Sequence, residues 1–414
     1  MPFMLDIAAT VQDVVTNTPV IDMHTHLFAP QMGALGLWGI DHLLTYHYLE
    51  AELFRSSPIR PQQYWALDKT AQADLIWKVL FVENPPISEA TRGVVAVLSA
   101  LGIDTEAENL RSAREYFGPL RLDDHITNVL RISGVSSVVM TNDPLDPSES
   151  VEWNAGRGPH PRFHAALRLD RILKDWPEHW GVLASMGYAV EPDLGGKTAA
   201  EVRRFLDVWA ARTHPKYMAV SLPDSFTFPS EDLTARLLAD AILPACRDWD
   251  IPMALMIGVR RQVNPELRLA GDGAGRADLR ALESICSQFP ENRFLVTVLS
   301  RENQHELCVY ARKFANLLPF GCWWFLNNPS IVEEVTRERL EMLGASFIPQ
   351  HSDARILEQL IYKWRNTRRT ITPILTRTYE LLAEDGRQVS KDEIRRDVAR
   401  MFQTNFERFT NRAR

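Results

Sequence analysis

Eight short apolar runs recur along the chain, and most are followed by a loop and a segment with helical spacing of apolar residues. The runs are Val20–Met23, Val135–Met140, His164–Leu167, Tyr217–Leu222, Ile251–Ile257, Arg293–Leu299, Phe320–Leu326 and Ala345–Pro349. Continuous apolar runs of this length are typical of parallel strands that helices cover on both faces. Eight strands alternating with helices predict an α/β fold, a (β/α)8 TIM barrel.

A long interval separates the first two runs and is too long for one crossover. Four helical patterns lie between residues 30 and 130: Asp41–Phe54, Gln62–Val79, Ala90–Leu101 and Glu106–Tyr116. No flexible linker brackets them, so we interpret residues 30–130 as a helical insertion on a single barrel domain spanning 1–414. Two further helices are expected at Leu233–Asp248 and Asp278–Gln288.

The C-terminal segment, residues 356–414, is expected to form helices that pack on the outside of the barrel. Ser390 and Glu393 make the S-x-x-E pattern of a helix capping box. The apolar residues that follow at helical spacing are Ile394, Val398, Phe402, Phe406 and Phe409. The arginines between them are interpreted as a solvated face.

Charge and composition exclude several classes of protein. The chain has 46 Lys and Arg against 53 Asp and Glu, a net charge of −7, which disfavours a nucleic-acid partner. No apolar run approaches the roughly 20 residues of a membrane span, and the start, MPFMLDIAATVQDVV, lacks the basic region of a signal peptide. Four widely spaced cysteines without a CxxC pair indicate a reducing, cytoplasmic setting. The oligomeric state, including a homo-oligomer, stays open.

The strongest chemical pattern is Pro19-Val-Ile-Asp-Met-His-Thr-His26 at the end of the first run. Residues two apart in a strand point to the same side, so His24 and His26 can bind one metal ion together. The C-terminal ends of barrel strands are where such enzymes build their sites. A satisfied pair of polar side chains is the alternative.

Asp353, just after the last run, is the expected third ligand. Two imidazoles and one carboxylate leave coordination positions for water or substrate, as in a catalytic metal site. Asp353 can also cap a helix expected at Ile356–Trp364. His351, two residues earlier, is either a group that orients the acid or an ordinary core histidine.

Six short motifs, in this order, are similar to those of the uronate isomerase family of the amidohydrolase superfamily. They are His24-Thr-His26, Tyr46-His47-Tyr48, Thr141-Asn142-Asp143-Pro144, Leu167-Arg168-Leu169-Asp170, Trp323-Trp324-Phe325 and Asp353-Ala354-Arg355. The resemblance covers most of the chain. It implies a (β/α)8 barrel with a helical insertion after strand 1 and the aldose–ketose isomerisation of hexuronates such as glucuronate or galacturonate.

The resemblance also assigns roles to residues. It implies one divalent metal ion (Zn, Fe or Mn) held by His24, His26 and Asp353. Catalysis falls to Asp353, Arg355 and Tyr48, and the sugar acid is surrounded by His47, Tyr48, Arg168, Arg355 and one of Trp323 and Trp324.

The chemistry of these residues agrees with a sugar-acid substrate, although each has a plainer alternative. Arg168 and Arg355 suit a carboxylate because a guanidinium donates two parallel hydrogen bonds, and the alternative is a salt bridge to a loop acid. His47 and Tyr48 also fit an amphipathic helix. Strand alternation allows only one of the two tryptophans to face the interior. Asp353 or a metal-bound water is the candidate base, with Tyr48 or His47 assisting.

Two departures from the family pattern limit the resemblance. Met256 stands where relatives carry a strand-5 histidine, and Leu222-Pro223-Asp224-Ser225 lacks the histidine of the strand-4 element. Strand 4 offers no lysine for a bridging carbamate and strand 6 offers no histidine, so one metal ion or none is expected.

Two alternative functions therefore stay open. One is a mononuclear metal-dependent hydrolase with Asp353 as the base, and the other is a non-catalytic barrel that binds a sugar acid. The glycine-rich segment Gly271–Gly275 matches no phosphate-binding motif and is interpreted as part of a mobile loop above the barrel mouth.

Overall fold

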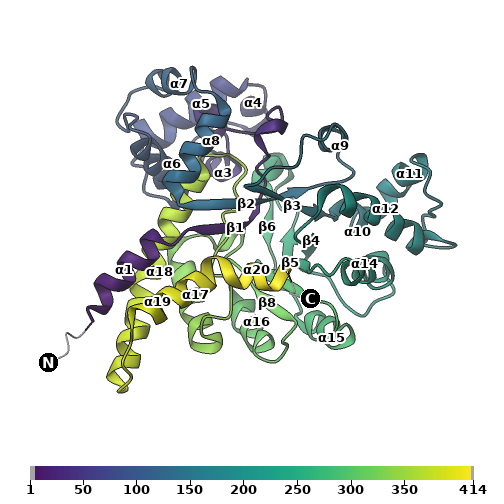
Figure 1. Cartoon of the computed structure of the whole chain (residues 1–414). Helices are drawn as coiled ribbons and strands as arrows, with labels where there is room; N and C mark the ends of the chain where they lie inside the picture. The colour runs from purple at the N-terminus through teal and green to yellow at the C-terminus, as the bar shows by residue number, and fades with distance from the viewer. Residues whose placement is uncertain (1–4, 412–414) are drawn as a thin grey trace.

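A parallel β-sheet organises the part of the chain that the computed structural model describes, residues 5–411. Its strands follow one another in chain order, as consecutive strand–helix units require (Figure 1). The parallel strands are β1 (Val20–Thr25), β2 (Val135–Asn142), β3 (Phe163–Arg168), β4 (Met218–Pro223), β5 (Met253–Arg260), β7 (Phe294–Val298) and β8 (Leu317–Pro319). A short strand, β6 (Gly273–Ala274), pairs antiparallel with β5.

The segment 345–354 lies between the last strand and the first. On one side Ile348 N–H donates to Pro319 O (3.1 Å). On the other side Asp353 N–H donates to His24 O (3.1 Å) and His26 N–H donates to Ala354 O (2.7 Å). Backbone hydrogen bonds thus connect this segment to both β8 and β1.

Helices fill the connections between the strands. Those after β2 are α9 (Pro147–Asn154), α10 (Asp170–Leu173), α11 (Trp176–Ser185), α12 (Thr198–Thr213), α13 (Leu233–Leu237), η3 (Leu238–Ile242), α14 (Leu243–Asp248), η4 (Pro265–Gly271), α15 (Arg280–Gln288), η5 (Arg301–Asn303), α16 (Gln304–Ala311), η6 (Trp324–Leu326) and α17 (Pro329–Leu343). Between β1 and β2 lie η1 (Pro30–Met32), α2 (Ile40–Leu44), α3 (His47–Ser56), α4 (Pro61–Trp65), α5 (Lys69–Trp77), η2 (Lys78–Val82), α6 (Glu89–Ala100), α7 (Arg111–Phe117) and α8 (Leu122–Ser133).

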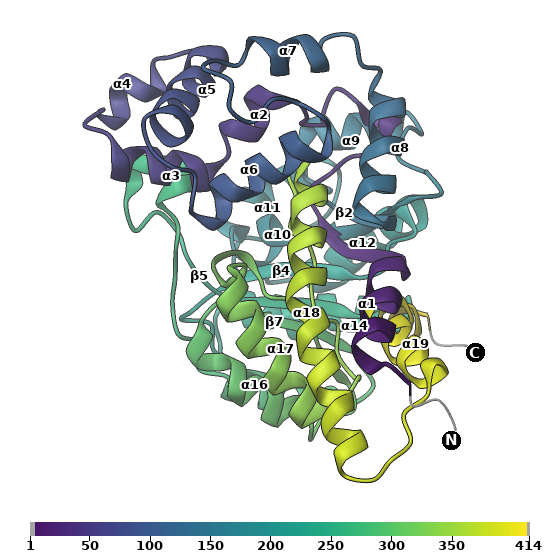
Figure 2. The same cartoon turned by 90° about the vertical axis from the view of Figure 1, so that its left-hand side faces the viewer.

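The first helix of the chain packs against helices of the C-terminal segment. The terminal helices are α1 (Ile7–Asn17), α18 (Gln359–Glu384), α19 (Lys391–Ala399), η7 (Arg400–Thr404) and α20 (Asn405–Thr410). The long α18 packs against α1 and α17, and it also contacts α6 and α8 of the segment between β1 and β2 (Figures 1 and 2). Residues 1–4 and 412–414, which the predictions for 1–414 and 356–414 include, lie outside the described residues.

Two main groups of apolar side chains form the core, and a third, small group lies around Cys322 and Val335. The larger one fills the space between the sheet and its covering helices. The smaller one gathers residues from every parallel strand, among them Met23, Val139, Ala219, Met256 and Leu295. Burial on both faces explains why the strand segments are continuous apolar runs.

The predicted strands near 20, 135, 164, 217, 251 and 293 are confirmed, but the last two predictions are wrong in detail. Strand β8 ends at Pro319, before the predicted run Phe320–Leu326, because Gly321 has a positive φ of 61° and turns the chain. The predicted strand at 345–349 makes a single bridge, between Phe320 and Ile348. These apolar residues are buried without being regular strand.

The helix predictions are confirmed at Leu233–Asp248, at Ala90–Leu101 within a residue and at Asp278–Gln288 within two, and Ser390 and Glu393 form both hydrogen bonds of the capping box. Other predicted helices begin or end elsewhere. Glu106–Tyr116 is helical only from Arg111, and Gln62–Val79 divides into α4, α5 and η2. Asp41–Phe54 is broken at Thr45 and Tyr46, where Thr45 Oγ1 donates back to Asp41 O and closes α2.

Two further predictions are wrong. The helix expected at Ile356–Trp364 begins at Gln359 and its N-cap is Glu358, so Asp353 does not cap it. The glycine-rich segment Gly271–Gly275 is not a free loop, because Gly273–Ala274 pairs with the end of β5. No helix in residues 5–411 is long and apolar enough to cross a membrane.

Candidate active site

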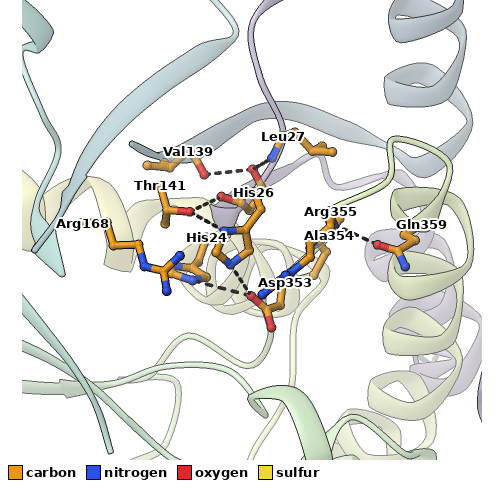
Figure 3. A network of polar contacts seen from close by, with 12 residues as sticks. His24, His26, Leu27, Val139, Thr141, Arg168, Asp353, Ala354, Arg355 and Gln359 are labelled. Atoms are coloured by element: carbon orange, nitrogen blue, oxygen red, sulfur yellow. Dashed lines mark hydrogen bonds and ion pairs between the residues drawn. The ribbon is translucent and has the colours of Figure 1, made fainter. Parts of the chain in front are cut away.

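His24, His26 and Asp353, the three predicted metal ligands, come together at the carboxyl end of β1 (Figure 3). His26 Nε2 lies 3.3 Å from Asp353 Oδ1, and His24 Nε2 lies 3.6 Å from the same oxygen. One candidate ligand atom from each residue lies within 4.8 Å of the others. Within the described residues, this is the one group of histidine, cysteine and acidic side chains with that geometry.

The backbone is irregular at this point. Asp22 pairs with Val138 but Thr25 pairs with Met140, so β1 carries an extra residue beside its histidines. Such a bulge re-aims side chains next to active sites. Asp353 has a positive φ of 52°, which is uncommon for a residue with a side chain and is found at functional sites that the surrounding structure holds in place.

Burial sets the protonation states of the three groups. Desolvation lowers the pKa of His24 well below its usual value and also lowers the pKa of His26, so both imidazoles are neutral at neutral pH. Burial by itself raises the pKa of Asp353, but His26 and His24 outweigh it when they are protonated at low pH and hold that pKa well below its usual range. The site therefore presents two neutral imidazoles and one carboxylate.

These donors fit a divalent metal ion. Asp353 Oδ1 is buried and accepts no hydrogen bond from any described group, a costly situation that a cation would relieve. Two nitrogen ligands and one oxygen ligand match a catalytic site with open positions. His24, His26 and Asp353 are thus able to hold one metal ion.

A cavity opens beside this group. Counted with its mouth and the open solvent there, it has about 460 Å³ of space free of atoms. Its wall includes the predicted site residues His24, His26, His47, Arg168, Trp323, Trp324, Asp353 and Arg355. The structure thus gathers all but one of the predicted site residues around a single cavity.

The two predicted arginines differ in their surroundings. Arg168 is paired with Asp170, which also contacts Lys174 at 2.9 Å. Burial raises the pKa of Asp170, but Arg168 and Lys174 outweigh burial and lower that pKa to about 2. Asp170 therefore stays ionised and keeps the Arg168 guanidinium in an ion pair. Arg355 forms no ion pair with any described side chain. Its guanidinium is available to a carboxylate ligand.

His47 and Tyr48 begin α3, because the chain breaks between α2 and α3. His47 lies on the cavity wall, and its Nε2 is buried without a described hydrogen-bond partner. Tyr48 is the predicted site residue that is not on the wall; its ring packs on His47 at 4.6 Å, and Lys363 Nζ lies 5.5 Å from its centre. Both were predicted within one longer helix, and that prediction is wrong.

Both tryptophans line the cavity, so the prediction that only one would do so is wrong. Strand alternation does not apply to them, because they follow β8 and lie at the start of the short helix η6. Trp324 has a positive φ of 46° and packs on the His47 ring at 5.7 Å. The turn of the chain between β8 and η6 brings the side chains of Trp323 and Trp324 to one wall of the cavity.

Other wall residues were missed or given no role. Met256 lines the cavity, where the resembling family carries a histidine. Arg261 follows β5, and its guanidinium lies 2.5 Å from Asp272 and 5.6 Å from the centre of Trp324. Its position directly after a predicted strand was the available signal. Thr141 and Ser221 also line the wall; Thr141 belongs to the motif Thr141-Asn142-Asp143-Pro144 but was given no role, and Ser221 was missed.

His351 is fully buried, and neither ring nitrogen has a described hydrogen-bond partner. Burial lowers the pKa of His351 to about 4. Its ring lies 5.4 Å from that of His24 and is absent from the cavity wall. It makes no hydrogen bond that would orient Asp353.

A parallel α/β sheet with two histidines and one carboxylate gathered at the ends of its strands is the arrangement of a metal-dependent enzyme. The chain belongs to the uronate isomerase family. It shares 49% identity with a uronate isomerase from Bacillus halodurans, over 98% of this chain and 96% of that one, with a TM-score of 0.96.

Two more distant structures show the same fold. A uronate isomerase from Thermotoga maritima has a TM-score of 0.79 at 16% identity, covering 98% of this chain and 97% of that chain. A glucuronate isomerase from Caulobacter crescentus has a TM-score of 0.75 at 16% identity, covering 99% and 94%. No family model matches the sequence, and no curated protein matches it either.

Proposed function

We propose that the chain catalyses the aldose–ketose isomerisation of a hexuronate such as glucuronate or galacturonate. One observation carries this proposal: the unpaired Arg355 guanidinium shares a cavity with His24, His26 and Asp353. A sugar acid needs both features, a cation for its carboxylate and a site for chemistry at its other end. Membership of the uronate isomerase family supports the same reaction.

The protein's own side chains divide the reaction between them. Arg355 binds the substrate carboxylate through paired hydrogen bonds. Asp353, ionised, accepts the proton from C2 and returns it to C1. His47, neutral because burial lowers its pKa, carries the hydroxyl proton from O2 to O1. We assign this second transfer to His47 rather than Tyr48, because His47 is on the cavity wall.

We propose a single divalent ion, Zn, Fe or Mn, held by His24, His26 and Asp353. When bound, it supplies Lewis-acid polarisation of the sugar's carbonyl and hydroxyl oxygens and stabilises the charge that develops on them. The flat walls formed by Trp323 and Trp324 exclude water and orient the open-chain sugar acid.

We propose that the sheet closes into a (β/α)8 barrel in which segment 345–354 takes the position of the eighth strand. The backbone hydrogen bonds of that segment to β8 and β1 support closure. In this arrangement the chain is one domain, with residues 30–130 inserted and 356–414 packed outside. Four buried free cysteines support a cytoplasmic location. The partner is a small sugar acid, with neither nucleic acid nor membrane, and self-association stays open.

Deuterium exchange tests the reaction most directly. The full chain, loaded with Zn²⁺ or Mn²⁺, is incubated with glucuronate and with galacturonate in deuterium oxide. We expect a ketose product and deuterium at C2 of the recovered aldose, because the abstracted proton exchanges with solvent. Asp353→Asn is the control and should show neither.

The alternatives predict different results. Hydrolysis of other substrates, with silence on every uronate, would indicate the metal-dependent hydrolase. Tight binding of uronates without turnover or exchange would indicate a non-catalytic sugar-acid barrel.

A further inference from the structure

Each of the two site histidines contacts a buried hydroxyl through its Nδ1 nitrogen. His24 Nδ1 lies 3.0 Å from Tyr217 Oη, and His26 Nδ1 lies 2.9 Å from Thr141 Oγ1. Tyr217 is fully buried and Thr141 is 4% exposed. The two hydroxyls come from different parts of the sheet, Tyr217 just before β4 and Thr141 within β2.

The proton of each hydroxyl is already engaged. Tyr217 O–H donates to Met23 O at 2.7 Å, and Thr141 O–H donates to Thr25 O at 2.9 Å. A carbonyl oxygen only accepts, so these contacts are favourable only when the hydroxyl proton points at the carbonyl. Each hydroxyl oxygen is then left to accept a hydrogen bond, and the group placed to donate it is the imidazole Nδ1–H.

This arrangement determines which nitrogen carries the proton. A neutral imidazole has one N–H group, so a proton on Nδ1 leaves the Nε2 lone pair free. Both Nε2 atoms lie beside Asp353 Oδ1. Three lone-pair atoms facing one another repel unless a cation lies among them.

We propose that Tyr217 and Thr141 are positioning residues that hold His24 and His26 in the Nδ1–H form and thereby set the affinity of the metal site. This inference rests on the metal site of the proposed function. The repetition supports it: both hydroxyls donate to the carbonyl of the β1 residue directly before the histidine that they contact. Close packing of the side chains does not by itself require two hydroxyls that each contact a histidine and donate to the carbonyl before it.

Metal affinity tests the proposal without an activity assay. Metal-free full-length protein is titrated with Zn²⁺ in competition with a chromophoric chelator. Tyr217→Phe and Thr141→Val should each weaken Zn²⁺ binding by about 10- to 100-fold, the usual effect of losing a group that orients a ligand. Thr141→Ser keeps the hydroxyl and should restore most of the affinity.

The chain offers a matched control in Ser136. Its hydroxyl also donates from β2 to a β1 carbonyl, Val20 O at 2.8 Å, but it contacts no histidine among the described residues. Ser136→Ala should bind Zn²⁺ like the unchanged protein. An equal loss in Ser136→Ala and Thr141→Val would overturn the proposal, because the effect would then be one of strand stability.

A spectroscopic readout addresses the tautomers themselves. In ¹⁵N-histidine NMR of the metal-free protein, His24 and His26 should show the proton on Nδ1, and Thr141→Val should alter the His26 signal but not that of His24. Protons found on Nε2 would overturn the proposal.

Zn²⁺ affinity distinguishes the positioning role of the two hydroxyls from the metal site itself. Unchanged Zn²⁺ affinity in both hydroxyl variants, with loss in Asp353→Asn, would overturn the positioning role and leave the metal site intact. Unchanged affinity in Asp353→Asn would instead overturn the metal site.

Discussion

Arg355 and Arg168 show how one residue type takes two roles within one cavity. Asp170 pairs with the Arg168 head group and also contacts Lys174, whereas Arg355 has no described ion-pair partner. An ion pair within the protein reduces what an arginine can offer to a ligand, because the ligand must displace the acid. At the scale of single residues, Arg355 is therefore the better anchor for a substrate carboxylate.

Replacing Arg355 tests this assignment. Arg355→Met should reduce kcat/KM for uronates by at least about 100-fold, because a charged hydrogen-bonded pair contributes several kcal/mol when buried. Arg355→Lys should recover only part of it, since an ammonium cannot donate two parallel hydrogen bonds. Steady-state kinetics measures the change in kcat/KM, and elemental analysis measures the bound metal. Bound metal should be unchanged, and normal turnover in Arg355→Met would remove this residue from the substrate site.

At the scale of elements, helix α3 carries a buried acid as well as His47. Glu50 is 7% exposed and accepts a hydrogen bond from Tyr64 Oη at 3.1 Å. Burial raises the pKa of Glu50 to about 7. The folded protein therefore binds this proton more tightly than the unfolded chain, whose glutamate has a pKa near 4.5.

Glu50 therefore makes the free energy of unfolding depend on pH. The contribution of neutral Glu50 is fully present below pH 4.5 and is lost as the pH rises to about 7. Glu50→Gln stays neutral and keeps an acceptor for Tyr64. Relative to the unchanged protein, it should gain about 2 to 3 kcal/mol of unfolding free energy between pH 5 and pH 8.

Thermal unfolding of both proteins at the two pH values measures this difference. Glu108→Gln, at an exposed position, is the control and should show no pH-dependent difference. A constant difference between Glu50→Gln and the unchanged protein would contradict the prediction.

At the scale of the whole molecule, the site joins the two ends of the sheet. His24 lies on β1 and His26 directly follows it, and Asp353 lies on the segment that is bonded to both β8 and β1. Asp22 strengthens this junction: its carboxylate accepts hydrogen bonds from Ser352 N–H at 3.0 Å and from Trp364 Nε1–H at 2.8 Å. A metal ion there connects residues that are far apart in the sequence.

Metal removal should therefore destabilise the entire fold. An ion that binds only the folded state stabilises it by about 2.7 kcal/mol at 100 times its Kd. Treatment with a chelator should lower the Tm, and added Zn²⁺ or Mn²⁺ should restore it. Asp353→Asn should show no such dependence. A Tm that is independent of metal in the unchanged protein would contradict the prediction.

Local pattern was enough to predict much of this protein. Burial on both faces makes a parallel strand a continuous apolar run, so most strands were found within a few residues. The HxH pattern at the end of β1 and the acid Asp353 were enough to predict the candidate metal site, because the strand ends of a parallel sheet meet at one edge.

Tertiary structure decided the rest. Hydrophobicity reports that a residue is buried but not its backbone geometry, so the turn at Gly321, which puts both tryptophans on one wall, was invisible in the apolar run Phe320–Leu326. Tyr217 carries no signal in the sequence, and Thr141 stands in a motif that assigns it no contact with His26. Only folding brings their hydroxyls to the histidines, since a hydrogen bond depends on distance and direction in space and not on separation along the chain.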